Sequence, residues 1–166
     1  MPSVTGHEAS TLSPEERLDR LGLELPDIAP LPVGNFANAV RVGNMLYVSG
    51  QGPVTADGRL MTGKVGRDLD AGEAYAHARL AGLNLLAVAR HEIGGLSAIT
   101  RVVKLFGMVN AAPDFAEHPR VINGCSDLLT KLFGERGVHA RSAVGMGSLP
   151  NNITVEIEAI FELGDA

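Results

Sequence analysis

The chain has 166 residues, of which 45% are hydrophobic and 20% charged, the balance of one globular domain with a single core. Its formal net charge of −5 and its aromatic content of 4%, with no Trp, argue against a broad nucleic-acid-binding face and a base-stacking platform. The single cysteine, Cys125, excludes an intramolecular disulfide and a multi-cysteine metal site, which favours a reducing, cytoplasmic location.

The N-terminal region predicts one short helix and no targeting signal. The first residues lack the basic start and apolar run of a signal peptide. Ser13 as N-cap, Pro14 at the first helical position and Glu16 three residues after the cap predict a helix that ends by Pro26. We assign residues 1–28 to an extension that carries this helix, and residues 29–166 to the main domain.

A β-hairpin is expected next. One strand is predicted from Phe36 to Val42 and its partner from Met45 to Ser49, joined by the two-residue turn Gly43-Asn44. Residues 60–67 that follow predict either a short edge strand or a loop.

Two longer helices flank a third strand in the middle of the chain. Asp70 and Glu73 predict a capping box for a helix that ends near Gly94, and its nearly apolar run, residues 80–89, is too short to cross a bilayer. The strand is predicted over residues 99–109, and the second helix over residues 119–133. The first helix carries a stripe of small and aliphatic residues suited to close packing: Ala74, Ala78, Ala81, Leu85 and Val88.

The last stretch, residues 139–161, predicts two strands joined by a turn at residues 149–152 as a second hairpin. The order hairpin, helix, strand, helix, hairpin predicts an α+β fold. In this fold two main helices pack on one face of a mixed, mainly antiparallel sheet, and the short N-terminal helix is added to it.

The chemistry-bearing residues of this second hairpin are Arg141 and Glu156. If their strands are neighbours, the two side chains form either a structural ion pair or a small acid-binding site. In such a site Arg141 would bind a carboxylate and Glu156 would handle a proton or a water molecule. The sequence contains no Gly-rich phosphate loop ahead of a helix, no ligand-like spacing of histidines and no Gly-x-Ser-x-Gly elbow.

Other reactive side chains receive structural interpretations. Cys125 falls on the apolar stripe of the second main helix, which favours a buried thiol over a nucleophile. Lys64 and Arg67 could contact an anion, although a solvated loop is favoured. Three histidines on or beside helices are expected at the surface: His77, His91 and His118.

The segments Arg141-Ser142-Ala143-Val144, Leu149-Pro150 and Val155-Glu156-Ile157-Glu158-Ala159 together resemble the C-terminal signature of the RidA/YjgF family of reactive-intermediate deaminases. The resemblance extends upstream to Gly43-Asn44 and Ser49-Gly50-Gln51. It implies a chorismate-mutase-like fold and a homotrimer with clefts between subunits. It also implies hydrolysis of 2-imino or 2-enamino acids to 2-keto acids and ammonia, without a metal or an organic cofactor.

The resemblance also assigns roles to single residues. Arg141 matches the carboxylate-binding arginine and Glu156 the glutamate that positions water, and both are therefore candidate catalytic residues. Five further positions match the substrate-binding cleft: Phe36, Ser49, Gly50, Asn123 and Ala143. Phe36 stands where deaminase-type members have tyrosine, and Ala143 where many have cysteine. These two differences leave open a non-catalytic trimer that binds a small carboxylic metabolite, and ribonuclease activity is a third, weaker alternative.

Overall fold

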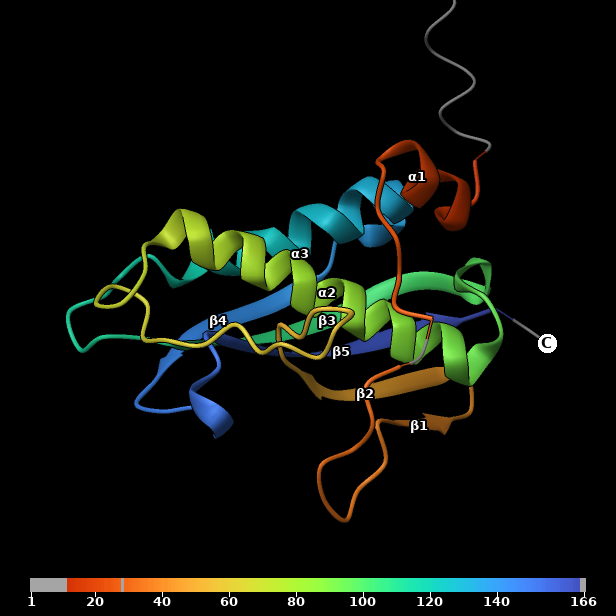
Figure 1. Cartoon of the computed structure of the whole chain (residues 1–166). Helices are drawn as coiled ribbons and strands as arrows, with labels where there is room; N and C mark the ends of the chain where they lie inside the picture. Colours follow the sequence, from red (N-terminus) through yellow and green to blue (C-terminus); the bar gives the residue numbers. More distant parts are fainter. Residues whose placement is uncertain (1–11, 28, 165–166) are drawn as a thin grey trace, which may run out of the picture.

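A computed structural model describes residues 12–27 and 29–164, so the N-terminal residues for which no signal peptide is expected lie outside the described part. Five strands form one sheet in the order β1-β2-β5-β3-β4, and helices α2 and α3 lie side by side over one face of it (Figure 1). The predicted α+β architecture is confirmed. The elements in chain order are α1 (Pro14–Arg20), β1 (Ala39–Val42), β2 (Met45–Gln51), α2 (Ala71–Ile93), η2 (Leu96–Ala98), β3 (Ile99–Asn110), α3 (His118–Phe133), η3 (Gly134–Gly137), β4 (Ala140–Met146), η4 (Pro150–Asn152) and β5 (Val155–Leu163).

The predicted hairpin at the end of the chain is wrong. β4 pairs in parallel with β3, whereas β5 pairs antiparallel with the other side of β3, so β3 lies between the last two strands. β4 and β5 do run in opposite directions, as the turn at residues 149–152 predicted. The alternation of side chains identifies the two faces of a strand but not its neighbour, and this is why the sequence pattern misled.

The first hairpin is confirmed, with a shorter first strand. Val42 pairs with Met45 around the turn, where Gly43 has φ +60°, a conformation that glycine adopts without strain. β1 begins at Ala39, and Phe36 lies in the irregular segment that follows the prolines. Residues 60–67 contain isolated bridges only and are a loop.

Both predicted capping boxes are present. Ser13 Oγ accepts from the Glu16 amide at 3.2 Å while Glu16 Oε2 accepts from the Ser13 amide at 2.7 Å. Asp70 and Glu73 exchange the same two bonds at 2.9 and 3.1 Å. α2 ends at Gly94 as expected, but α1 ends at Arg20, before Pro26.

The core lies between the helices and the sheet, and the whole predicted small-residue stripe of α2 is buried. α2 and α3 approach closely at Gly124, where an added Cβ would lie 2.0 Å from the Tyr75 carbonyl oxygen. The N-terminal helix α1 is tied to this body by Glu15, whose carboxylate accepts from the Leu96 amide at 2.6 Å and from Ser97 Oγ at 3.0 Å. Among residues 12–27 and 29–164, no helix has both the length and the apolar character needed to cross a membrane.

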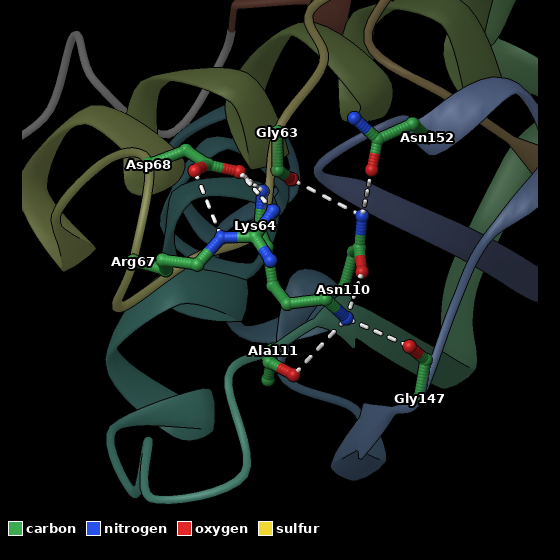
Figure 2. A network of polar contacts seen from close by, with 8 residues as sticks. All are labelled: Gly63, Lys64, Arg67, Asp68, Asn110, Ala111, Gly147 and Asn152. Atoms are coloured by element: carbon green, nitrogen blue, oxygen red, sulfur yellow. Dashed lines mark hydrogen bonds and ion pairs between the residues drawn. The ribbon is translucent and has the colours of Figure 1, made fainter.

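A polar network fastens the loop of residues 60–67 to the ends of β3 and β4 (Figure 2). Lys64 Nζ donates to Asn110 Oδ1 at 2.9 Å, to the Ala111 carbonyl at 3.4 Å and to the Gly147 carbonyl at 2.7 Å. Asn110 is buried, and its amide donates to Gly63 O at 3.2 Å and to Asn152 Oδ1 at 3.0 Å. Lys64 is therefore a structural residue, and its prediction as part of a solvated loop is wrong.

The Lys64→Met variant is expected to lose about 1–3 kcal/mol of unfolding free energy, because the buried Asn110 oxygen loses its donor. The matched control is Arg67→Met, since Arg67 lies in the same loop but is exposed and contacts Asp68 at 2.9 Å. Surface pairs of this kind contribute little to stability. Denaturant unfolding of both variants measures the difference, and equal stabilities would contradict the assigned role of Lys64.

Candidate functional site

Arg141 lies on the face of the sheet that the helices cover. In the register of the sheet it stands beside Leu105, which in turn stands beside Ala159, and both of these neighbours are buried in the core. Paired residues of neighbouring strands point to the same face. Because β4 is an edge strand, the Arg141 side chain reaches α3 while staying half-exposed.

The guanidinium of Arg141 is held by α3 from one side. Nη1 donates to Asn123 Oδ1 at 2.8 Å and to Ser126 Oγ at 3.0 Å, and Nη2 donates to the Pro119 carbonyl at 3.4 Å. These contacts use three of the five N–H donors of the group. In the described part of the chain, the donor at Nε and the second donor at Nη2 have no acceptor. This edge matches the two oxygens of a carboxylate.

Ala143 follows Arg141 on the same face of β4. It stands beside Gly107 of β3 and packs partly against the core. An added Cβ at Gly107 would lie 2.6 Å from the Ile122 side chain, so α3 rests directly on β3 here. We call Arg141, Asn123, Ser126 and Ala143 the arginine half-site.

Glu156 lies on the opposite, open face of the sheet. It stands beside Met108, and Met108 stands beside the exposed Val144. Partial burial raises the pKa of the Glu156 carboxyl above its ordinary value of 4.5, and the nearby carboxylate of Glu158 raises that pKa further. A raised pKa makes this carboxylate a stronger proton acceptor, as the role of a general base requires.

A β-bulge places Ser49 and Gly50 next to Glu156. Both residues stand opposite Glu158, between the register pairs Val48–Ala159 and Gln51–Ile157. An added Cβ at Gly50 would lie 2.3 Å from Glu156 Oε1, so only glycine leaves room for this carboxylate. Ser49 Oγ donates to the Ala37 carbonyl at 2.7 Å and so ties down the segment that carries Phe36.

Phe36 is 51% exposed and lies outside β1, although the predicted strand began at this residue. The neighbouring residue Ala37 accepts the hydrogen bond of Ser49, so Phe36 adjoins this contact along the chain. We call Glu156, Ser49, Gly50 and Phe36 the glutamate half-site.

The two half-sites lie on opposite faces of one sheet, so within one chain the structure does not bring Arg141 and Glu156 together. The alternative of a structural ion pair between them is therefore wrong, because it depended on the incorrect hairpin.

Sequence reasoning missed Ser126 of the arginine half-site and also His139, which lies behind Ser126. Ser126 Oγ lies 2.9 Å from His139 Nε2, and His139 Nδ1 lies 2.6 Å from the Gly137 carbonyl oxygen. The spacing of both residues in the sequence could have identified them. Ser126 follows Asn123 by three residues on a helix, and His139 precedes Arg141 by two residues in an extended segment, so each shares a face with its predicted neighbour.

Other predicted side chains have structural surroundings. Cys125 is fully buried, which raises the pKa of its thiol to about 12 and confirms the buried-thiol interpretation. His91 is exposed as expected, but His77 is half-buried and lies 3.1 Å from Thr154 Oγ1, so its assignment to the surface is wrong. His118 is half-buried too, in edge-on contact with Phe115. Within residues 12–27 and 29–164, no three His, Cys, Asp or Glu side chains are grouped as metal ligands.

Comparisons with known proteins agree with this architecture. Residues 15–163 match the family model described as "YjgF/chorismate_mutase-like, putative endoribonuclease". The chain is 42% identical over 149 residues to protein TCP17 of Trypanosoma cruzi, covering 89% of this chain and 92% of that protein. It is 32% identical over 134 residues to a 2-iminobutanoate/2-iminopropanoate deaminase of Dermatophagoides farinae, covering 80% of this chain and 89% of that protein.

A solved structure extends the likeness to the fold. The crystal structure of protein Atu1372 from Agrobacterium tumefaciens superposes with a TM-score of 0.84 at 46% identity, covering 91% of this chain and 92% of that one. The family model spans most of the described residues, and both half-sites lie within it. The chain therefore belongs to the RidA/YjgF family and has its chorismate-mutase-like α+β fold.

Proposed function

We propose that the chain hydrolyses 2-imino and 2-enamino acids to 2-keto acids and ammonia, in clefts between the subunits of a homotrimer. The observation that carries this proposal is the anchored guanidinium of Arg141, whose Nε donor and second Nη2 donor have no acceptor among the described residues. Such an edge binds a carboxylate through two parallel charge-assisted hydrogen bonds. The deaminase of Dermatophagoides farinae supports the choice of reaction. The single, buried cysteine is compatible with the reducing cytoplasm in which we place this activity.

The position of the half-sites supports the proposed assembly. The open face of the sheet carries exposed apolar side chains, such as Val42 at 61% and Tyr47 at 45% exposure. It also has a hollow of about 290 Å³ lined by residues that include Ser49, Phe106 and Glu158. A neighbouring copy that covers this face with its β4 edge would place its own Arg141 near Glu156. Each cleft would thus combine the arginine half-site of one subunit with the glutamate half-site of the next.

The reaction needs only these groups and water. Arg141 holds the carboxylate and thereby fixes the electrophilic iminium carbon in one orientation. Glu156 accepts a proton as water adds to that carbon, which gives a carbinolamine. The proton then moves from Glu156 to the amine nitrogen. The carbon–nitrogen bond breaks as the hydroxyl group gives its proton back to Glu156, and the 2-keto acid and ammonia leave. No electron is transferred, so the reaction requires no redox cofactor.

A second candidate is a trimer that binds a small carboxylic acid without turnover. Two observations favour it. Phe36 offers no hydroxyl beside the glutamate half-site, and Ala143 places a methyl group in the arginine half-site where a thiol would add a polar group. This candidate shares the carboxylate anchor and differs only in the chemical step.

The test is a coupled assay in which an amino-acid oxidase generates 2-imino acids and keto-acid formation is followed. The wild type is expected to accelerate hydrolysis, and Arg141→Ala to raise KM about 100-fold, because two charge-assisted hydrogen bonds are lost. Arg20→Ala, at an exposed position on α1, is the matched control and should retain wild-type kinetics.

Two outcomes would contradict parts of the proposal. If the wild type accelerates no imino acid but binds 2-ketobutyrate in calorimetry through Arg141, the binding candidate replaces the deaminase. A mass near 17.4 kDa by light scattering would remove the intersubunit cleft, because one chain separates Arg141 from Glu156.

A further inference from the structure

Arg141 is held by more than its direct contacts. Its partner Ser126 is itself held by His139, and His139 is held by a backbone carbonyl. The distances along this chain of contacts are 3.0 Å from Nη1 to Ser126 Oγ, 2.9 Å from Oγ to His139 Nε2, and 2.6 Å from His139 Nδ1 to the Gly137 oxygen. All three side chains are half-buried, which limits competition from water.

With a neutral imidazole, only one arrangement of protons satisfies these contacts. A guanidinium can donate but cannot accept, so Ser126 Oγ must accept from Arg141. The hydroxyl then has its own proton to give, and His139 Nε2 is the acceptor within reach. An accepting Nε2 requires that the imidazole proton be on Nδ1, where it is donated to the Gly137 carbonyl. For a neutral His139 the network therefore specifies one tautomer, with the proton on Nδ1.

We propose that Ser126 and His139 are positioning residues for Arg141, with His139 acting as the neutral tautomer protonated at Nδ1. This proposal rests on the proposed function, in which the free edge of Arg141 binds the substrate carboxylate. Asn123 and Ser126 take both protons of Nη1 from two sides, and this fixes the plane of the guanidinium. The rotation that would turn the Nε and Nη2 edge away from the cleft is thereby blocked.

The surroundings of His139 favour the same protonation state. Burial lowers the pKa of its imidazole below the ordinary value of 6.5, and the Gly137 carbonyl, which raises it, only partly offsets this effect. The positive charge of Arg141 lowers this pKa further. A protonated His139 would place a second cation on the hydroxyl that already contacts Arg141.

The first test measures the protonation state and tautomer of His139 in the absence of any ligand. Nitrogen-15 NMR of the full-length protein near pH 7.5 reports the tautomer of each imidazole, and His139→Gln assigns the signal. We expect a neutral His139 protonated at Nδ1, and a change in its Nε2 shift in Arg141→Met. A protonated ring, the other tautomer, or a signal that does not respond to Arg141→Met would overturn the proposal.

The second test uses the binding of 2-ketobutyrate and the kinetics of the coupled assay. Ser126→Ala is expected to weaken binding roughly ten-fold, through KM with little change in kcat, whereas Ser126→Thr retains the hydroxyl and the affinity. At position 139 the glutamine oxygen can replace the accepting Nε2, but the shorter asparagine cannot. His139→Gln should therefore bind nearly as the wild type does, and His139→Asn roughly ten-fold more weakly.

The exposed His91→Asn is the control for the histidine series and should not change binding. Equal affinities for Ser126→Ala and the wild type, or for the glutamine and asparagine variants, would overturn the proposal. Thermal melts of each variant separate a lost contact from a lost fold. If the wild type binds no keto acid at all, the proposed function fails, and the NMR response to Arg141→Met alone decides whether the network holds the arginine.

Discussion

Replacing Glu156 by glutamine is expected to lower kcat for 2-imino acids by a factor of about 10²–10⁴, the usual contribution of a general base. Glutamine keeps the size of the side chain but cannot take a proton from water. Binding of 2-ketobutyrate should change little, because the carboxylate anchor is Arg141. The measurement is the coupled assay combined with calorimetry on the same preparation.

The matched control is Glu158→Gln, two residues along β5 on the same open face. Glu158 raises the pKa of Glu156, and its replacement should therefore lower that pKa while turnover is retained. In the wild type the acid limb of the pH–rate profile is expected above pH 4.5, because activity should be lost as Glu156 takes up its proton. In Glu158→Gln this limb should move to lower pH. In Glu156→Gln the pH–rate profile of any residual activity should lack this limb.

The pH dependence of the unfolding free energy tests the role of Glu156 independently of activity. Because its pKa is raised in the folded protein, the folded state binds the proton more tightly than the unfolded state. The resulting stabilisation is fully present below pH 4.5 and is lost as the pH rises through the raised pKa. At neutral pH, Glu156→Gln should therefore melt at the wild-type temperature or slightly above it. A variant that keeps its turnover but melts earlier would show that Glu156 is structural.

The local features of the fold could be predicted because they depend on neighbouring residues. The capping boxes at Ser13 and Asp70 and the turn at Gly43 are each specified within a few positions of the chain. The pairing of β4 with β3 depends on residues about 36 positions apart, and no periodicity reports it. The prediction therefore had the direction of β5 right and its neighbour wrong.

The same distinction explains the site. Asn123 and Arg141 were matched through the family resemblance, and α3 does bring them into contact. Glu156 was placed beside Arg141 only because the two strands were taken as neighbours. With β3 inserted between them, the two residues face opposite sides of the sheet, and a site that contains both would need a second copy of the chain. Lys64 shows a related error, since its three acceptors come from two distant segments, residues 110–111 and Gly147, that converge only in the fold.

Among substitutions that add one methyl group to α2 or α3, Gly124→Ala is expected to destabilise the protein most. Helix propensity alone predicts the opposite, because alanine favours a helix interior over glycine by about 1 kcal/mol. The new Cβ, however, would lie 2.0 Å from the Tyr75 carbonyl oxygen, 2.9 Å from the Tyr75 carbonyl carbon and 3.0 Å from the Arg79 amide nitrogen. All three atoms belong to the backbone of α2, so no side-chain rotation relieves the overlap.

Relief therefore requires α2 and α3 to separate by about 1 Å or more, since carbon atoms pack at about 3.5–4.0 Å. This separation would loosen the fully buried contacts between the two helices, and we expect a net loss of about 2–4 kcal/mol of unfolding free energy. For a chain of this size the melting temperature should fall by roughly 5–15 °C. Circular dichroism melts and denaturant titrations measure both quantities.

Two other glycines provide the matched series. An added Cβ at Gly147 has no atom within 4 Å, so Gly147→Ala should leave stability nearly unchanged. At Gly82 the Cβ would approach Cys125 Sγ at 3.0 Å and Leu128 Cδ2 at 3.1 Å, side-chain atoms that can shift, and the loss should be intermediate. The expected order of stability is Gly147→Ala, Gly82→Ala, Gly124→Ala. A Gly124→Ala protein as stable as the wild type would mean that the two helices are not in backbone contact at this crossing.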